Sequence, residues 1–154
     1  MSTLIGVISD THGLLRPEAM RALEGVERIL HAGDVGGPEI LDALGTLAPV
    51  TAVRGNTDHG GWALKLPETE LVEVESATLF MLHDLGGLDL DPVAAGFQVI
   101  ISGHTHRPVS EMRQGVLYLN PGSAGPRRFR LPVSLARIKV AGRKVDAELI
   151  ELNG

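Results

Sequence analysis

The stretch FQVIISGHTH, residues Phe97–His106, decides how the rest of the chain is interpreted. An apolar, β-branched run typical of a buried strand ends at Gly103 and is followed at once by two histidines one residue apart. On a strand or its extended exit, this spacing places both imidazoles on the same side of the chain. Two exposed loop histidines would show the same pattern, so the pair indicates a site only together with similar residues at the ends of other strands.

Four other apolar runs also end in residues that can bind a metal. Leu4–Ser9 precedes Asp10 and His12, Arg28–His31 precedes Asp34, Pro49–Val53 precedes Asn56, and Thr78–Leu82 precedes His83. In α/β proteins, ligands bind at the carboxyl ends of the strands. The sequence therefore predicts one site assembled from five strand ends.

The order of the elements predicts an α/β fold. Apolar runs at 4–9, 27–31 and 50–53 alternate with helices that begin at Pro17 and Pro38, and this βαβαβ order implies parallel strands with right-handed crossovers. Later segments are predicted to form hairpins, at 71–83, 109–120 and 133–152, with a brief helix after Asp91. We expect a single domain over residues 1–154, a four-layer α/β sandwich with two mixed β-sheets flanked by helices.

Composition narrows the function classes. The 154 residues are 44% hydrophobic and 21% charged, as in an ordinary globular enzyme. No window approaches the roughly 18 apolar residues of a membrane span, and the amino terminus shows no signal peptide. The absence of cysteine excludes thiolate metal sites. We therefore expect a cytoplasmic protein without a membrane partner.

A net charge of −5 argues against binding to extended nucleic acid, which needs a basic face. The one basic cluster is Arg127-Arg128-Phe129-Arg130. It could be a solvated loop, a contact in a homo-oligomer or a local anion-binding segment.

Seven residues at the strand exits offer nitrogen or oxygen ligands without sulfur. This donor set suits Mn, Fe, Co, Ni or Zn better than Ca or Mg. Seven ligands are too many for one ion but fit two ions that share a carboxylate, about 3.5–4 Å apart, as in sites that act on phosphoryl groups. The seven are Asp10, His12, Asp34, Asn56, His83, His104 and His106.

Two further histidines are set apart. His31 lies inside an apolar run, which predicts a histidine of the core or one that supports a ligand. His59 lies among glycines and is expected to be a solvated loop residue.

The ordered motifs Asp10-Thr11-His12, Gly33-Asp34, Gly55-Asn56-Thr57-Asp58, His83 and Gly103-His104-Thr105-His106 resemble the blocks of the calcineurin-like metallophosphoesterase superfamily. The short length and Asn120-Pro121-Gly122-Ser123 resemble its small prokaryotic phosphodiesterase branch, and the likeness spans residues 4 to about 126. The resemblance implies that Asp10, His12, Asp34 and His106 hold one ion and Asp34, Asn56, His83 and His104 the other, with Asp34 as the bridge.

The resemblance also implies an activity. We expect a metal-dependent phosphodiesterase that uses two divalent transition-metal ions and acts on a small phosphoester, with Mn as the first expectation and Fe, Ni, Co or Zn as alternatives. A hydroxide that bridges the ions would attack phosphorus in line, Asn56 would stabilise the charge that builds on the phosphoryl oxygens, and Asp58 would hold a ligand in place.

Two positions depart from the family pattern. Thr57 stands where many members have a histidine that protonates the leaving oxygen, and threonine cannot act as an acid near pH 7. Easily departing leaving groups should therefore be favoured. Asp84 stands where the branch usually has glycine, and it could orient an imidazole or face solvent.

A non-catalytic scaffold is the alternative function. A eukaryotic retromer subunit resembles the same branch and serves as an interaction module with an altered metal site. All seven expected ligands are present here, which favours the enzyme. A DNA nuclease would need an added domain or a basic face, and the short acidic chain shows neither.

Overall fold

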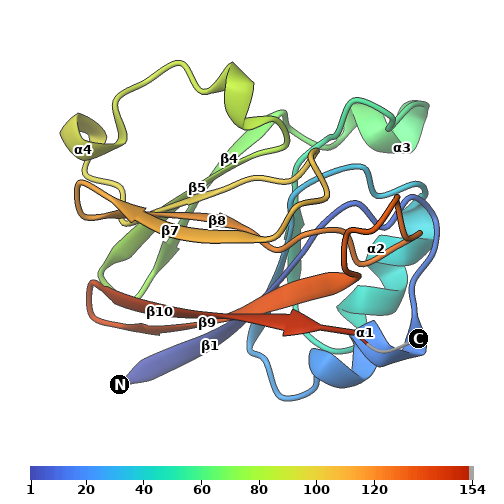
Figure 1. Ribbon diagram of the computed structural model, residues 1–154, viewed down its shortest axis with the longest axis horizontal. Coiled ribbons are helices and arrows are strands. Elements are labelled where there is room, and N and C mark those ends of the chain that lie inside the picture. The colour runs from blue at the N-terminus through green and yellow to red at the C-terminus, as the bar shows by residue number, and fades with distance from the viewer. Residues whose placement is uncertain (153–154) are drawn as a thin grey trace.

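Two five-stranded β-sheets pack face to face in the computed structural model, which describes residues 1–152 (Figure 1). The first sheet has the strand order β10 (Lys144–Glu151), β9 (Ser134–Ala141), β1 (Ser2–Ile8), β2 (Arg28–His31) and β3 (Val50–Ala52). The second has the order β4 (Thr69–Val74), β5 (Ala77–Leu82), β6 (Val99–Ile101), β8 (Val116–Asn120) and β7 (Val109–Arg113).

The first half of the chain forms the expected βαβαβ unit. Strands β1, β2 and β3 are parallel, and they are joined by α1 (Pro17–Ala22) and α2 (Pro38–Gly45). Each helix has proline at its start, where the missing N–H costs no hydrogen bond. Strand β9 pairs antiparallel with β1, and β10 extends the same edge, so the sheet is mixed as predicted.

The second sheet contains two of the three predicted hairpins. Strands β4 and β5 pair antiparallel, as do β7 and β8, whereas β6 lies parallel to both β5 and β8. The third hairpin, β9–β10, belongs to the first sheet. The sequence did not predict α3 (Gly61–Leu64), because four residues are too few for a helical period to be recognised.

Apolar side chains fill the space between the sheets and cover their outer faces. Ile5 and Leu30 from the first sheet pack with Leu79 and Ile101 from the second in one fully buried cluster. The helices α1 and α2 cover the outer face of the first sheet. The outer layer on the second sheet is thinner, since it consists of η1 (Leu85–Gly87), α4 (Pro92–Ala95) and their loops. The mixed α/β sandwich is thus confirmed, with full helices on one side only.

The parallel strands determine where polar loop residues gather. Strands β1, β2 and β3 end at one edge of the first sheet, and the parallel strands β5 and β6 end at one edge of the second. None of the helices among residues 1–152 is long and apolar enough to cross a membrane.

His31 ties the loop after β1 to the loop after β2. It is fully buried, its Nδ1 accepts a hydrogen bond from the N–H of Gly33 at 3.1 Å, and its Nε2 lies 3.0 Å from the hydroxyl of Thr11. Because Nδ1 accepts, Nε2 carries the proton and donates to Thr11, whose hydroxyl donates to the carbonyl of Val35 at 2.7 Å. The expected core histidine is therefore a neutral connector beneath the strand ends.

Acid should weaken the fold through His31. Burial lowers the pKa of its imidazole to about 4, whereas an unfolded histidine titrates near 6.5. Between these two pH values His31 is protonated in the unfolded chain but not in the folded one. The free energy of unfolding therefore falls as the pH drops from about 6.5 to about 4, by about 3 kcal/mol from this group. Urea unfolding of chelator-treated wild type and His31→Gln across this range checks it. The variant should be less stable at pH 7 but lose less on acidification, and equal pH slopes would contradict the prediction.

Candidate metal centre

All seven expected ligands lie at one edge of the sandwich, on the loops that follow β1, β2, β3, β5 and β6. Asp10 lies at the centre of one group and is fully buried. Its Oδ1 is 3.4 Å from Nε2 of His106 and 3.7 Å from Nε2 of His12. The two histidine Nε2 atoms are themselves 3.2 Å apart. Three atoms that can coordinate a metal ion therefore converge on one point.

A second group forms around Asp34, which is 3% exposed. Its Oδ2 lies 3.2 Å from Nε2 of His83 and 3.7 Å from Nε2 of His12, so this carboxylate faces both groups. Asp10 also faces both, because its Oδ1 is 3.9 Å from Nε2 of His83. Geometry alone makes either carboxylate a candidate for the shared ligand.

The remaining two residues extend the second group toward solvent. Nδ1 of His104 lies 3.2 Å from Oδ1 of Asn56, and the ring of His104 contacts that of His83 edge-on, with centroids 5.2 Å apart. Nε2 of His104 faces Oδ2 of Asp84 at 3.9 Å, and the other oxygen of this carboxylate accepts the N–H of Gly86 at 3.0 Å. Asp84 thus points toward an imidazole of the centre.

The backbone of the centre is held in an unusual conformation. Five of the seven residues have φ between 47° and 73°, a region that L-residues rarely adopt and that clusters at functional sites. The five are Asp10, His12, Asp34, His104 and His106. A side chain at Gly103 would collide with Ser9 and with the carboxylate of Asp10, which explains the glycine before His104.

The residues present fit a transition-metal ion. Three buried polar atoms have no hydrogen-bond partner among residues 1–152: Oδ1 of Asp10, Nε2 of His83 and Nδ1 of His106. Nδ1 of His83 lies 2.8 Å from the carbonyl of Ala32 and must donate to it, so Nε2 presents a lone pair to the carboxylates. Buried acceptors that face one another are costly unless a cation or a proton lies between them.

The protonation equilibria show the same electrostatic conflict. Burial raises the pKa of the Asp10 carboxyl, against the opposing effects of the Ser9 hydroxyl and nearby histidines. Burial also opposes ionisation of Asp34, but its contacts with His83 and with the N–H of Thr57 hold its pKa well below the usual range. Burial disfavours charge on His83, yet Asp34 and Asp10 raise its pKa. Hydrogen-bond donors and histidines oppose the effect of burial on the two carboxylates, and a metal ion would strengthen that opposition.

Asp58 supports the centre through the backbone. Its carboxylate is 5% exposed and accepts hydrogen bonds from the N–H groups of Val35, Gly36 and Gly55, at 3.2, 3.0 and 2.9 Å. These groups flank Asp34 and Asn56 in the chain. Asp58 was expected to hold a ligand in place, and its contacts are with the backbone: it fastens together the two loops that carry Asp34 and Asn56.

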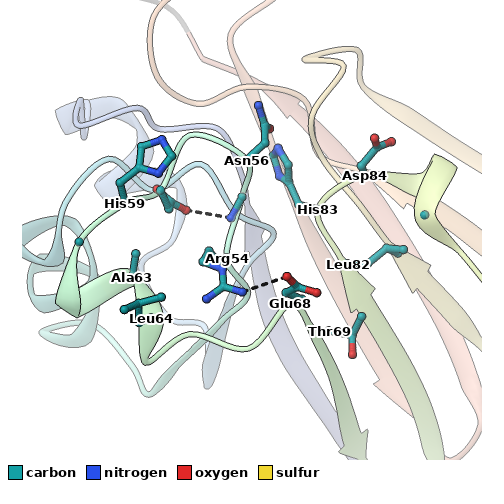
Figure 2. Close-up of a pocket in the computed structure, with 14 residues that line it drawn as sticks. Arg54, Asn56, His59, Ala63, Leu64, Glu68, Thr69, Leu82, His83 and Asp84 are labelled. Atoms are coloured by element: carbon teal, nitrogen blue, oxygen red, sulfur yellow. Dashed lines mark hydrogen bonds and ion pairs between the residues drawn. The ribbon is translucent and has the colours of Figure 1, made fainter.

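A hollow of about 570 Å³ opens beside the second group (Figure 2). Asn56 and His83 form part of its wall, with His59 and Asp84 on opposite sides of them in this view. Arg54 lines the same hollow and pairs with Glu68 at 3.0 Å. His59 is exposed as expected, but its place in this wall was not predicted, because a histidine followed by two glycines carries no pattern that indicates a pocket.

Comparison with known proteins agrees with the geometry. Residues 3–143 match the calcineurin-like phosphoesterase superfamily domain. A probable metallophosphoesterase of Methanothermobacter thermautotrophicus is 42% identical over 159 aligned positions, covering 96% of this chain and 91% of the relative. The phosphodiesterase YfcE of Escherichia coli K12 is 34% identical over 140 positions, 75% of this chain and 76% of the relative.

Among solved structures, vacuolar protein sorting 29 from Cryptosporidium parvum superimposes with a TM-score of 0.84 at 21% identity, covering 99% of this chain and 92% of that one. At this identity the likeness shows a shared fold and no more. The family match and the first relative each cover nearly the whole chain. The chain therefore belongs to the calcineurin-like phosphoesterase superfamily and is a metal-dependent phosphoester hydrolase.

Proposed function

We propose that the chain is a phosphodiesterase with a centre for two divalent transition-metal ions. The observation that carries the proposal is the buried pair of unpartnered acceptors, Oδ1 of Asp10 and Nε2 of His83, which lies among five other side chains able to bind a metal. Two sets of ligand atoms, each within 4.8 Å of one another, overlap at Asp10. A protein gains nothing by burying such a group for stability alone.

The proposed ligand sets follow the family pattern. Asp10, His12, Asp34 and His106 would hold one ion, and Asp34, Asn56, His83 and His104 the other. The position of Asp34 between His12 and His83 supports its role as the bridge. When bound, two such ions would supply the hydroxide nucleophile and neutralise charge on the phosphoryl oxygens. Mn is the first candidate, as the family resemblance implies, and the mixed nitrogen and oxygen donors also suit Fe, Ni, Co and Zn.

The remaining residues have roles in binding. Asn56 lies both in the second ligand set and in the wall of the hollow, so its amide can meet a phosphoryl oxygen that enters from this side. His59 and Asp84 also line the hollow, and each could contact the leaving group. Thr57 is exposed, and it contacts the centre at Asp34: its backbone N–H donates to the carboxylate at 2.9 Å, and its side chain also helps to lower the pKa of that carboxyl.

Asp34→Asn should remove metal and activity together. Wild type should carry close to two ions per chain after loading with Mn, as measured by elemental analysis. The variant should hold one ion or none and lose about 100-fold or more in kcat/KM on bis(p-nitrophenyl) phosphate, since losing a ligand costs more than losing the partner of a ligand. The asparagine oxygen can still accept the N–H of Thr57, so the fold should persist.

The matched control is Asp42→Asn, which makes the same chemical change at an exposed position on α2. It should keep both ions and full activity. Equal losses in the two variants, or a wild type that binds no transition metal, would sink the proposal. Circular dichroism of the chelator-treated variants separates a lost ligand from a lost fold.

Leaving-group dependence tests the consequence of Thr57. Without an acid at this position, kcat/KM should fall steeply from aryl to alkyl diesters, because the departing oxygen leaves as an anion. Each leaving-group pKa unit is expected to cost a sizeable part of the ~1.4 kcal/mol that separates tenfold rates. Thr57→His should flatten the series if the imidazole reaches the leaving oxygen.

A flat series in the wild type would show that another group already supplies the proton. His59 and Asp84 are then the candidates, because both line the hollow beside Asn56. The substitution, His59→Gln or Asp84→Asn, that makes the dependence on leaving-group pKa steeper would identify the residue that supplies the proton. That result would overturn the expected substrate preference and leave the metal centre intact.

A further inference from the structure

The basic cluster at Arg127–Arg130 lies at the rim of the metal centre. The segment just before it packs against the loop after β1: the Ser123 hydroxyl donates to the carbonyl of Asp10 at 2.9 Å, and the N–H of Ala124 donates to that of Ser9 at 3.0 Å. Arg107 directly follows His106 in the chain and lines a hollow with Arg130. In Figure 1 this segment is the orange connection between β8 and β9.

The cluster adjoins the side of the centre that His12 and His106 form. Gly125 packs so closely on the loop after β1 that a side chain there would collide with the backbone of Thr11 and Asp10. Arg107, which shares a hollow with Arg130, is the residue that follows His106. The hollow that contains His59, Glu68 and Asp84 lies instead against Asn56 and His83.

Four guanidinium groups of this rim lack a partner in the described part of the chain. None of residues 1–152 forms a hydrogen bond or ion pair with the side chains of Arg107, Arg127, Arg128 or Arg130. Glu151 borders a neighbouring hollow with Arg127 and Arg130 without pairing with either. Unpaired arginines gathered on a chain of net charge −5 create a local field that attracts anions.

Phe129 has a backbone conformation that hairpin geometry does not explain. Among residues 1–152, eight non-glycine residues have positive φ: five belong to the metal centre, and Glu75 and Gln114 lie in hairpin turns. The eighth is Phe129, with φ of 55° and 89% exposure. With Leu131, Arg107 and Arg130 it lines a hollow of about 680 Å³, an apolar wall beside two cations.

Resting on the proposed function, we propose that this rim, Arg107 with Arg127–Leu131, binds a second anionic group on the non-reacting side of the substrate. The substrate class is then a phosphodiester that carries a further phosphate or carboxylate. Arginine binds such groups through paired charge-assisted hydrogen bonds, and Phe129 and Leu131 offer an apolar surface to the part of the substrate that joins the two anions. The unequal charge on the two flanks orients the substrate, since on the opposite side Arg54 and Glu68 offset each other and Asp84 adds a negative charge.

The test uses two substrates that differ by one phosphate. The p-nitrophenyl ester of thymidine 5′-phosphate and its 3′-phosphorylated counterpart share a leaving group, with the nucleoside as spacer. In each, water oxygen bonds to phosphorus, the bond to nitrophenolate breaks, and the released nitrophenolate is measured. Mn-loaded wild type should show a kcat/KM about tenfold higher for the bisphosphate, since each exposed arginine contributes modestly.

The ratio of the two kcat/KM values measures how much the rim contributes to recognition of the additional phosphate. Arg107→Gln and Arg130→Gln should each reduce it, and the double variant should bring it close to one. Arg143→Gln is the matched control, because Arg143 is exposed in the β9–β10 turn, at the end of the sheet away from the centre. It should leave the ratio unchanged.

A binding measurement gives a readout that needs no loaded enzyme. Calorimetric titration of chelator-treated protein with thymidine 3′,5′-bisphosphate should show tighter binding to wild type and Arg143→Gln than to the double variant. A wild-type ratio of one, a ratio that survives the double variant, or unchanged binding would overturn the inference. A double variant that turns a dimer into a monomer with the ratio intact would show that the rim is a subunit contact. If Mn-loaded wild type cleaves neither ester, the proposed function fails, and the calorimetry still decides the rim.

Discussion

Two buried carboxylates, those of Asp10 and Asp34, lie among histidines at the ends of neighbouring parallel strands. Much of the structure around them stabilises their negative charge. Burial disfavours the ionised form of both groups. The energetic penalty for an uncompensated buried charge is severe, so such groups persist only with partners or a metal. Here the partners are imidazoles, and among residues 1–152 one ring nitrogen of His83 and one of His106 have no hydrogen-bond partner. This arrangement suits a centre that binds cations, and it would be destabilising in a core that only supports the fold.

A layer of hydrogen bonds beneath the ligands holds the loops in register. His31 joins the loops after β1 and β2, and Asp58 joins those after β2 and β3. Both act on backbone groups or on a hydroxyl that itself binds the backbone. Rigid support of this kind allows five residues to keep left-handed backbone conformations, each of which costs free energy in isolation. The sandwich thus stores strain at the edge that carries the proposed metal centre.

The sequence was sufficient for the order of the elements along the chain and for placing the seven polar residues at one edge, because apolar runs and the residues that follow them indicate strands and their ends directly. It did not predict the order of the strands within either sheet. It could not predict that Asp58 binds three backbone N–H groups, that His59 joins the wall of a hollow, or that the segment before Arg127 packs on the loop after β1. These facts depend on how separate loops pack, and no local pattern encodes that. The left-handed φ values at His104 and His106 could not be predicted either, because non-glycine residues rarely adopt them.

The shared fold with vacuolar protein sorting 29 does not decide between catalysis and scaffolding, whereas the donor set of the centre bears on it directly. The central claim is that two ions bind here and share Asp34. Anomalous diffraction from crystals loaded with Mn measures this most directly. The account predicts two peaks about 3.5–4 Å apart, both in contact with the carboxylate of Asp34. A single peak, or two peaks that do not share that carboxylate, would contradict it.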